Sequence, residues 1–450
     1  MMNNRVTWGL VAILAVAGVV MVWNNLHHSP RQAYDAVMHA RSFEANKPSA
    51  VILPRPCAGI MAYNPPLYYY LIAKLNAATE SALRVDISPV RFARWLALVM
   101  FLWLGWASCS FLLPRTGDAA DTGSFNWYAL AFFLLPSQYL LLAMPRADHL
   151  LFLSFQLLLI LWYAADFPSR LPRSRWRQVT WGALLILMGN SRATFVAGWF
   201  PFFIWGGWIL WRNAGTAPPP RRLQRRILCL VALGTVGVLS FSFYLDRYIR
   251  TGKVAPGGHG AAYNYYKSLE KNLDKPAMFL NVDFRTMLAQ PNRHARYANG
   301  NNAFLPRLVN DMWADHWLYF SSTGRMGDQK VAWKRIVLVA AAPFTLLYFG
   351  CVFWCAMEGL GRAMHRQRPS LAHLAGWIYG AAFLLLMVFI SSMPEPGKNK
   401  AVTFGYLFAY NWLPFFCMAS VIRRVPRGMP ILTGYTFILF VLCLPLSVFW

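Results

Sequence analysis

Residues 333–357 read WKRIVLVAAAPFTLLYFGCVFWCAM, and this stretch decides the fold class. Lys334 and Arg335 are its only charged residues, and its apolar run matches the length of about 20 residues that a helix needs to cross a bilayer. The following stretch, EGLGRAMHRQRPS at 358–370, carries three arginines. Because positive charge gathers on the cytosolic side of membrane helices, the two segments together predict a span that ends in the cytosol.

Similar apolar segments recur along the 450-residue chain. They lie near 7–23, 90–112, 125–142, 149–165, 179–189, 194–211, 227–245, 333–357, 371–392, 402–421 and 431–450. These segments predict an all-α polytopic membrane protein with about eleven transmembrane helices. Segment 179–189 is short for a span, so it either begins in the preceding basic stretch or forms a re-entrant hairpin with the next segment.

The composition indicates lipid rather than water as the surrounding solvent. Hydrophobic residues make up 57% of the chain and charged residues 13%, which is too little charge to solvate a soluble protein of this size. A net charge of +26 would suggest a nucleic-acid partner for a soluble protein. Here the basic residues lie in short runs between apolar segments, where they orient the helices. We therefore expect membrane lipids as partners and no nucleic acid.

Basic residues on alternate stretches set the predicted orientation. With the N-terminus inside, the cytosolic stretches are 113–124, 166–178, 212–226, 358–370 and 422–430, and each is basic. Two long loops, 24–89 and 246–332, then lie outside, and we expect amphipathic helices in both. Of the 17 carboxylates only four are cytosolic, which leaves thirteen outside: the four are Asp118, Asp121, Asp166 and Glu358. Acid or base chemistry is therefore expected on the outside face.

The first outside loop contains the strongest candidates for chemistry. Asp35 and His39 are four residues apart, so on a helix they share a face, and a carboxylate oriented by an imidazole is suited to act as a general base. The alternative interpretation is that Asp35 caps a short surface helix beside a solvated histidine. Farther along, Asn64 precedes the run PPLYYY at 65–70, whose tyrosines suit an aromatic belt at the lipid headgroup level.

The second outside loop contains tryptophans and tyrosines interleaved with polar residues, as in DMWADHW at 311–317. Such residues suit stacking on sugar rings. They suit equally an amphipathic helix that lies on the membrane, and this second interpretation is the favoured one.

The order of several short motifs resembles the GT-C superfamily of integral membrane glycosyltransferases, which use polyprenyl-phosphate-linked sugars. After the first helix come a loop that opens with Asp35, the PPLYYY run, and the arginine-rich helix start VRFARWL at 90–96. The likeness continues with PRADH at 145–149, NSRAT at 190–194 and, more weakly, KNK at 398–400. It covers roughly the first 210 residues well and the rest loosely, and the order of the motifs carries it more than any single motif.

The resemblance implies a set of site residues. Asp35 would be the catalytic base, with His39 beside it and Asp148 as a second acidic residue. The implied substrate-binding residues, of which the basic ones would stabilise the departing polyprenyl phosphate, are Asn64, Tyr68, Arg146, His149, Arg192, Lys398 and Lys400. For the basic residues, contact with lipid headgroups is the alternative role.

The resemblance also implies a function and an arrangement of the chain. A sugar would pass from a polyprenyl-phosphate-linked donor to a lipid-linked glycan, polymer or protein acceptor. The site would face the periplasm of a bacterial inner membrane, or the lumen of the endoplasmic reticulum in a eukaryote. Residues 1–245 would form the catalytic transmembrane module, including loop 24–89. The outside loop 246–332 and the C-terminal transmembrane helices of 333–450 would follow.

Several points remain open at the level of the sequence. Some members of the superfamily carry Lys or His before the Pro-Pro pair, where this chain has Asn64. Asp35 and Asp148 are the only plausible partners for a metal ion, so a metal-independent mechanism is favoured and Mg or Mn stays open as a cofactor. A transporter or lipid flippase is the alternative function, but it would need ionisable residues inside the spans, which have almost none. A non-catalytic scaffold is the third hypothesis.

Overall fold

All regular structure in the described part of the chain is helical. The structure, a computed structural model, describes residues 4–27, 40–44, 67–112, 131, 134–135, 158, 175–191, 196–252, 282, 284–289, 305–306, 309, 313, 328–365, 367, 370–391 and 412–447. Within these residues lie twelve labelled helices: α1 (Asn4–His27), α3 (Leu67–Leu83), α4 (Pro89–Leu112), α8 (Arg175–Gly189), α9 (Val196–Gly215), α10 (Pro219–Ser240), α11 (Ser242–Thr251), α14 (Phe284–Ala289), α16 (Asp328–Met364), α17 (Leu371–Ser391), α19 (Trp412–Ile422) and α20 (Gly428–Ser447).

Three of the described helices are long and apolar enough to cross a membrane. They comprise Pro219–Ser240 in α10, Ala332–Met364 in α16 and Gly428–Pro445 in α20. These candidate spans indicate a multi-pass membrane protein, as the sequence predicted. The count of about eleven spans stays a prediction, because most of segments 125–142 and 149–165 lies outside the described residues.

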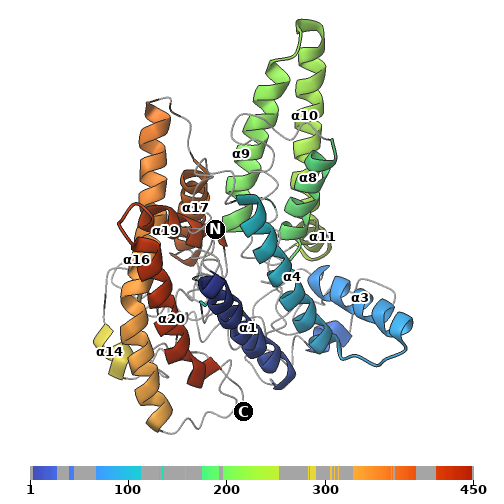
Figure 1. Ribbon diagram of the computed structural model, residues 1–450. Coiled ribbons are helices and arrows are strands. Elements are labelled where there is room, and N and C mark those ends of the chain that lie inside the picture. The colour runs from blue at the N-terminus through green and yellow to red at the C-terminus, as the bar shows by residue number, and fades with distance from the viewer. Residues whose placement is uncertain are drawn as a thin grey trace.

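The helix directions agree with the alternation predicted from the basic stretches. Figure 1 shows the turn between α9 and α10 and the C-terminal end of α16 towards the top of the view, and both are predicted to be cytosolic. Helices α3 and α14, which belong to the two predicted outside loops, lie in the lower half. We call the lower ends of the helices, which are predicted to lie outside, the outer ends and the upper ends the inner ends. The orientation itself stays a prediction.

Several helices begin before their predicted segments, because helices extend beyond their apolar windows. Helix α16, for example, begins at Asp328 rather than at residue 333. Helix α8 begins at Arg175, inside the basic stretch, which is the first of the two alternatives for segment 179–189. Its 15 residues reach only about 22 Å, still short of a bilayer core. Helix α10 begins at Pro219, so its arginines are helical rather than part of a loop at 212–226. A proline at the first helical position favours this early start.

The predicted span 227–245 is broken at Phe241, which separates α10 from α11. The Phe241 N–H bonds to the carbonyls of Gly237 and Leu239, and the Ser242 hydroxyl donates to the Leu239 carbonyl at 2.8 Å. These bonds satisfy carbonyls that would otherwise be left free where α10 ends, and so they stabilise the break.

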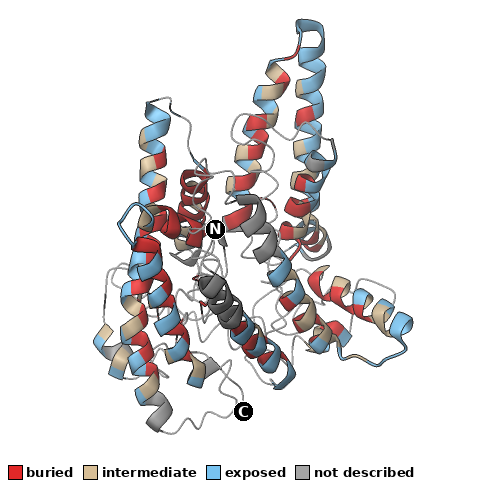
Figure 2. Ribbon diagram, viewed as in Figure 1, coloured by how far each residue is buried: buried red, intermediate tan, exposed pale blue. Residues whose placement is uncertain are grey.

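Most helices pack around one core, which Figure 2 shows in red along the facing sides of α9, α16, α17 and α20. Close approach of α16 and α17 depends on Gly376, because a side chain there would bring a Cβ within 2.6 Å of the Ala356 nitrogen. Small residues at such crossings are typical of helix packing in membranes. Away from this core, the inner ends of α10 and α16 extend beyond the bundle and are largely exposed (Figure 2).

Trp313 reaches this core from the second predicted outside loop. It is buried, and its indole N–H donates to the Thr345 hydroxyl at 2.8 Å. Thr345 lies midway along α16, so the tryptophan is packed inside the bundle. Neither sugar stacking nor a helix lying on the membrane describes Trp313, because the indole finds both its apolar contacts and its hydrogen-bond partner within the protein.

Candidate functional site

Of the ten site residues expected from the sequence, only Tyr68 belongs to the described part of the chain. Nine lie outside it: Asp35, His39, Asn64, Arg146, Asp148, His149, Arg192, Lys398 and Lys400. The meeting of Asp35 with Asp148 or His149 therefore stays a prediction. The structure does describe helices that adjoin several of these residues in the chain, such as α3, which follows Asn64, and α8, which precedes Arg192.

Tyr68 belongs to a small aromatic core between the start of α3 and the start of α4. Its ring lies 5.3 Å from that of Tyr69 and 5.8 Å from that of Phe43, measured between centroids. Ile72, Val90 and Ala93 complete this cluster, and Ala40 packs against it. Edge-to-face and tilted ring pairs at such distances stabilise packing beyond the area they bury. Ala40 is the residue that follows His39 in the chain. Its packing against the cluster attaches this part of the first predicted outside loop to the start of α4.

The tyrosine run only partly forms the aromatic belt that the sequence suggests. Tyr68 and Tyr69 are 4% and 2% exposed, and only Tyr70 is partly open. Burial, and then the neighbouring Tyr69, raise the pKa of the Tyr68 hydroxyl well above its ordinary value. The phenol therefore stays neutral, and Tyr68 is suited to packing and hydrogen bonding rather than to accepting a proton.

Arg94 is a charged residue of this region that the sequence did not single out. It is 1% exposed, one of the largest fully buried side chains in the described protein, and it has interaction partners within it. A buried guanidinium must be compensated by such partners, which fix its position. Arg94 therefore places a permanent positive charge near the outer end of α4. In the sequence, Arg94 is visible only as one of the two arginines of the motif at 90–96. The motif does not show which of the two is buried.

The connection between α3 and α4 is held by a polar network. The Asn76 amide donates to Glu80 Oε1 at 3.0 Å and to the Ile87 carbonyl at 2.9 Å. Glu80 Oε1 also accepts the Ile87 backbone N–H at 3.2 Å. Asn76 is fully buried, so these bonds fix the angle at which α3 meets α4. Glu80, one of the predicted outside carboxylates, thus has a structural role.

A second network lies at the outer ends of α8 and α10, where the NSRAT motif begins. The Asn190 amide donates to the Ile186 carbonyl at 3.0 Å and to the Leu239 carbonyl at 2.8 Å, and its oxygen accepts the Ser242 hydroxyl at 3.2 Å. The indole of Trp199 on α9 donates to the Ser240 hydroxyl at 3.1 Å. The residues that precede Arg192 are therefore anchored to three helices.

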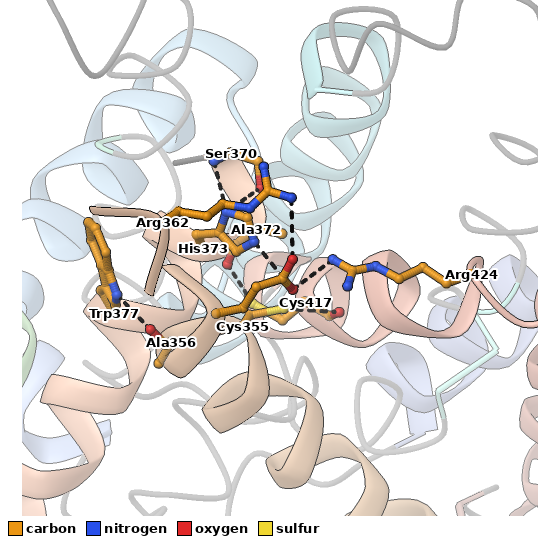
Figure 3. Close-up of polar contacts among 10 residues, drawn as sticks. Cys355, Ala356, Arg362, Ser370, Ala372, His373, Trp377, Cys417 and Arg424 are labelled. Carbon is orange, nitrogen blue, oxygen red and sulfur yellow. Dashed lines mark hydrogen bonds and ion pairs between the residues drawn. The ribbon is translucent and has the colours of Figure 1, made fainter. Parts of the chain in front are cut away.

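The third polar cluster lies towards the inner ends, around Glu358 of α16 (Figure 3). Its carboxylate accepts Arg362 at 3.4 Å and Arg424 at 2.8 Å, and it lies 3.5 Å from His373 Nε2. Arg424 belongs to the turn between α19 and α20, and His373 to α17. The cluster therefore ties three parts of the chain together through one carboxylate.

The arrangement of Ser370, His373 and Glu358 does not support nucleophilic catalysis. His373 Nδ1 lies 3.0 Å from the Ser370 hydroxyl, which superficially suggests an activated serine. However, Nδ1 also accepts the Ser370 backbone N–H at 2.9 Å. Because a neutral imidazole has one acceptor nitrogen, that lone pair is occupied and cannot remove the hydroxyl proton. The contact is the N-terminal cap of α17, a variant of the capping box.

Metal binding remains a matter for residues outside the described part. Among the described residues, no group of three or more His, Cys, Asp or Glu side chains is arranged to hold a metal ion. Asp35 and Asp148 are not among the described residues, so Mg or Mn stays open as a cofactor.

Comparisons with protein families, with curated proteins and with solved structures found no match to this chain.

Proposed function

We propose that this chain is a membrane glycosyltransferase that transfers a sugar from a polyprenyl-phosphate-linked donor on the non-cytoplasmic face. The acceptor is a lipid-linked glycan, a polymer or a protein. The observation that carries the proposal is the order of the motifs from Asp35 to NSRAT, which resembles the GT-C superfamily. Two described features adjoin these motifs in the chain: the aromatic core at the start of α4, which includes Tyr68, and the Asn190 network at the start of NSRAT.

In the proposed reaction, Asp35 removes the proton from an acceptor hydroxyl, with His39 orienting the carboxylate. The acceptor oxygen forms a bond to the anomeric carbon while the bond from that carbon to the phosphate oxygen breaks. The electron pair leaves with the polyprenyl phosphate, whose charge is stabilised by Arg146, Arg192, Lys398 and Lys400. Asp148 acts as the second acidic residue, and His149 and Asn64 contribute to binding of the sugar. Tyr68, which is buried, has a packing role beside the site.

The distribution of buried charge argues against the transporter alternative. Within the described residues, the buried basic side chains of the longer helices are Arg94, Lys334 and His373. Each lies in the first two turns of its helix, α4, α16 or α17 respectively. A transport pathway would place such residues near the middle of the spans, around a substrate site at the bilayer midplane.

The test of the proposal is the variant Asp35→Asn. Asparagine keeps the shape of the side chain but cannot accept a proton, so turnover should fall about a hundredfold or more. Transfer from a radiolabelled polyprenyl-phosphate sugar in proteoliposomes measures it. Asp86→Asn is the matched control, because Asp86 is an exposed carboxylate in the same predicted outside loop, and it should leave transfer unchanged. Normal transfer by Asp35→Asn would remove Asp35 as the base.

The outside location of this loop has its own test. Cys57 lies in the same loop. Five cysteines of the described helices are free and buried: Cys229, Cys351, Cys355, Cys417 and Cys443. Cys109 lies in the predicted span 90–112. A membrane-impermeant maleimide should therefore label intact spheroplasts, and Cys57→Ser should abolish that labelling. Labelling that appears only after the membrane is permeabilised would reverse the orientation and contradict the proposal.

A further inference from the structure

The turn between α9 and α10 carries a concentrated set of arginines. Arg212 lies in the last turn of α9, and four more lie among the first eight residues of α10. We call these five residues the arginine tip: Arg212, Arg221, Arg222, Arg225 and Arg226. Figure 1 shows this end of the hairpin at the top of the view, beyond the rest of the bundle.

Two of these arginines are held in place by the hairpin itself. Arg222 Nε donates to the Ala217 carbonyl at 3.3 Å, and the Arg226 guanidinium lies 4.9 Å from the centroid of the Trp211 ring. These contacts hold the two guanidinium groups against the same turn, although like charges four residues apart on a helix repel one another. The positive charge is therefore positioned by the fold.

The chain offers this charge no acidic partner nearby in the sequence. No Asp or Glu occurs between Asp166 and Asp246. Within the described residues, Arg226 Nε is buried and makes no hydrogen bond. The Glu358 cluster differs, because there two arginines share a carboxylate of the protein. Within the described residues, therefore, no carboxylate of the chain neutralises the arginine tip, and an anion from outside the chain can do so.

The surroundings of the tip indicate a lipid as the source of that negative charge. Beginning among the arginines and continuing beyond them, α10 exposes a row of large apolar side chains, which includes Leu223, Ile227 and Leu230. Trp208 on α9 is 62% exposed. The 22 residues of α10 reach about 33 Å, close to the thickness of a bilayer core, so its first turns lie at headgroup depth. Exposed tryptophan is typical of that depth.

We infer that the arginine tip binds the phosphate of an anionic phospholipid in the cytosolic leaflet, with the acyl chains lying along the exposed apolar row of α10. Guanidinium groups suit this ligand because they donate two parallel hydrogen bonds to a phosphate. Clusters of four to eight basic residues at the cytosolic end of a membrane helix are typical of binding to anionic lipids. The inference does not depend on the proposed transfer reaction.

The experiment uses the full chain, purified in a neutral detergent and titrated with phosphatidylglycerol or with phosphatidylcholine of the same acyl chains. Native mass spectrometry counts the retained lipids. We expect saturable retention of phosphatidylglycerol and little of phosphatidylcholine. The double variant Arg222→Gln/Arg226→Gln should bind phosphatidylglycerol about thirtyfold more weakly, since each basic residue near an anionic surface changes the affinity about fivefold.

Three controls make the result decisive. Arg285→Gln removes an exposed arginine from α14, at the outer end, and should bind phosphatidylglycerol like the wild type. Arg222→Lys/Arg226→Lys keeps the charge but loses the paired hydrogen bonds, and it should bind several-fold more weakly than the wild type. Inorganic phosphate should not displace the lipid at matched concentration. Three outcomes would each overturn the inference. The double glutamine variant, eluting from size-exclusion chromatography like the wild type, could bind phosphatidylglycerol unchanged; the lysine variant could bind it like the wild type; or inorganic phosphate could displace it.

Discussion

The outer and inner ends of the helices are held by different kinds of interaction. At the outer ends, the buried amides of Asn76 and Asn190 donate to backbone carbonyls of neighbouring segments. At the inner ends, Glu358 pairs with Arg362 and Arg424, whose side chains are 43% and 46% exposed. Buried hydrogen bonds fix geometry, whereas exposed ion pairs are weak and screened by salt. The comparison indicates that the outer ends are fixed by buried hydrogen bonds, whereas the Glu358 cluster at the inner ends depends on partly exposed charge.

The largest effect on stability is expected for Asn190→Ala. The substitution removes the two hydrogen bonds that the Asn190 amide donates and the one that its oxygen accepts. It also leaves the Leu239 carbonyl without this donor. The free energy of unfolding should therefore fall by about 2–3 kcal/mol. Thermal unfolding in detergent micelles measures the change. Asn213→Ala is the matched control at the inner end of α9, where the backbone carbonyl bonds to Thr216, and it should have little effect. If both variants lost the same free energy of unfolding, the difference between the outer and inner ends would be contradicted.

Asn76→Ala should have the next largest effect. It removes two donated hydrogen bonds, but Glu80 still accepts the Ile87 N–H, so the cost should be about 1–2 kcal/mol. The loosened α3–α4 connection should also speed hydrogen exchange in α3. Thr79→Ala, which removes only an exposed bond to the Leu75 carbonyl, serves as the control. If exchange in α3 stays at the wild-type rate, the network does not fix this angle.

Glu358→Gln should have the smallest effect, about 1 kcal/mol or less, because its arginine partners are half exposed. Glutamine keeps the shape but loses the charge. The difference from the wild type should shrink as salt is raised from about 0.1 M to 1 M, since ions screen exposed pairs. Thermal unfolding at the two salt concentrations measures it. A loss greater than that of Asn190→Ala, and insensitive to salt, would show that the inner ends are also fixed by buried interactions.

The sequence predicted the general character of the site region but not its packing. The apolar windows anticipated α1, α4, α17 and α20 closely, because hydropathy is a local property. Tyr68 and Tyr69 were expected to face lipid headgroups, yet Phe43, from a distant part of the same loop, covers them. Arg94 was visible only as one of two arginines in a motif. Its burial depends on how α4 is packed, which no local pattern records.

The sequence by itself determined that the chain is helical and apolar, and its basic stretches predict which helix ends face the cytosol. Both inferences depend on the free energy of transferring each segment from water to lipid. That free energy is set by about 20 neighbouring residues. Only the tertiary structure decided which polar residues are buried and what they hold. Asn190 bonds to residues 49 and 52 positions away, at Leu239 and Ser242. Such partners meet only when α8 packs against α10, because a buried polar group is satisfied by whichever segment the fold brings to it.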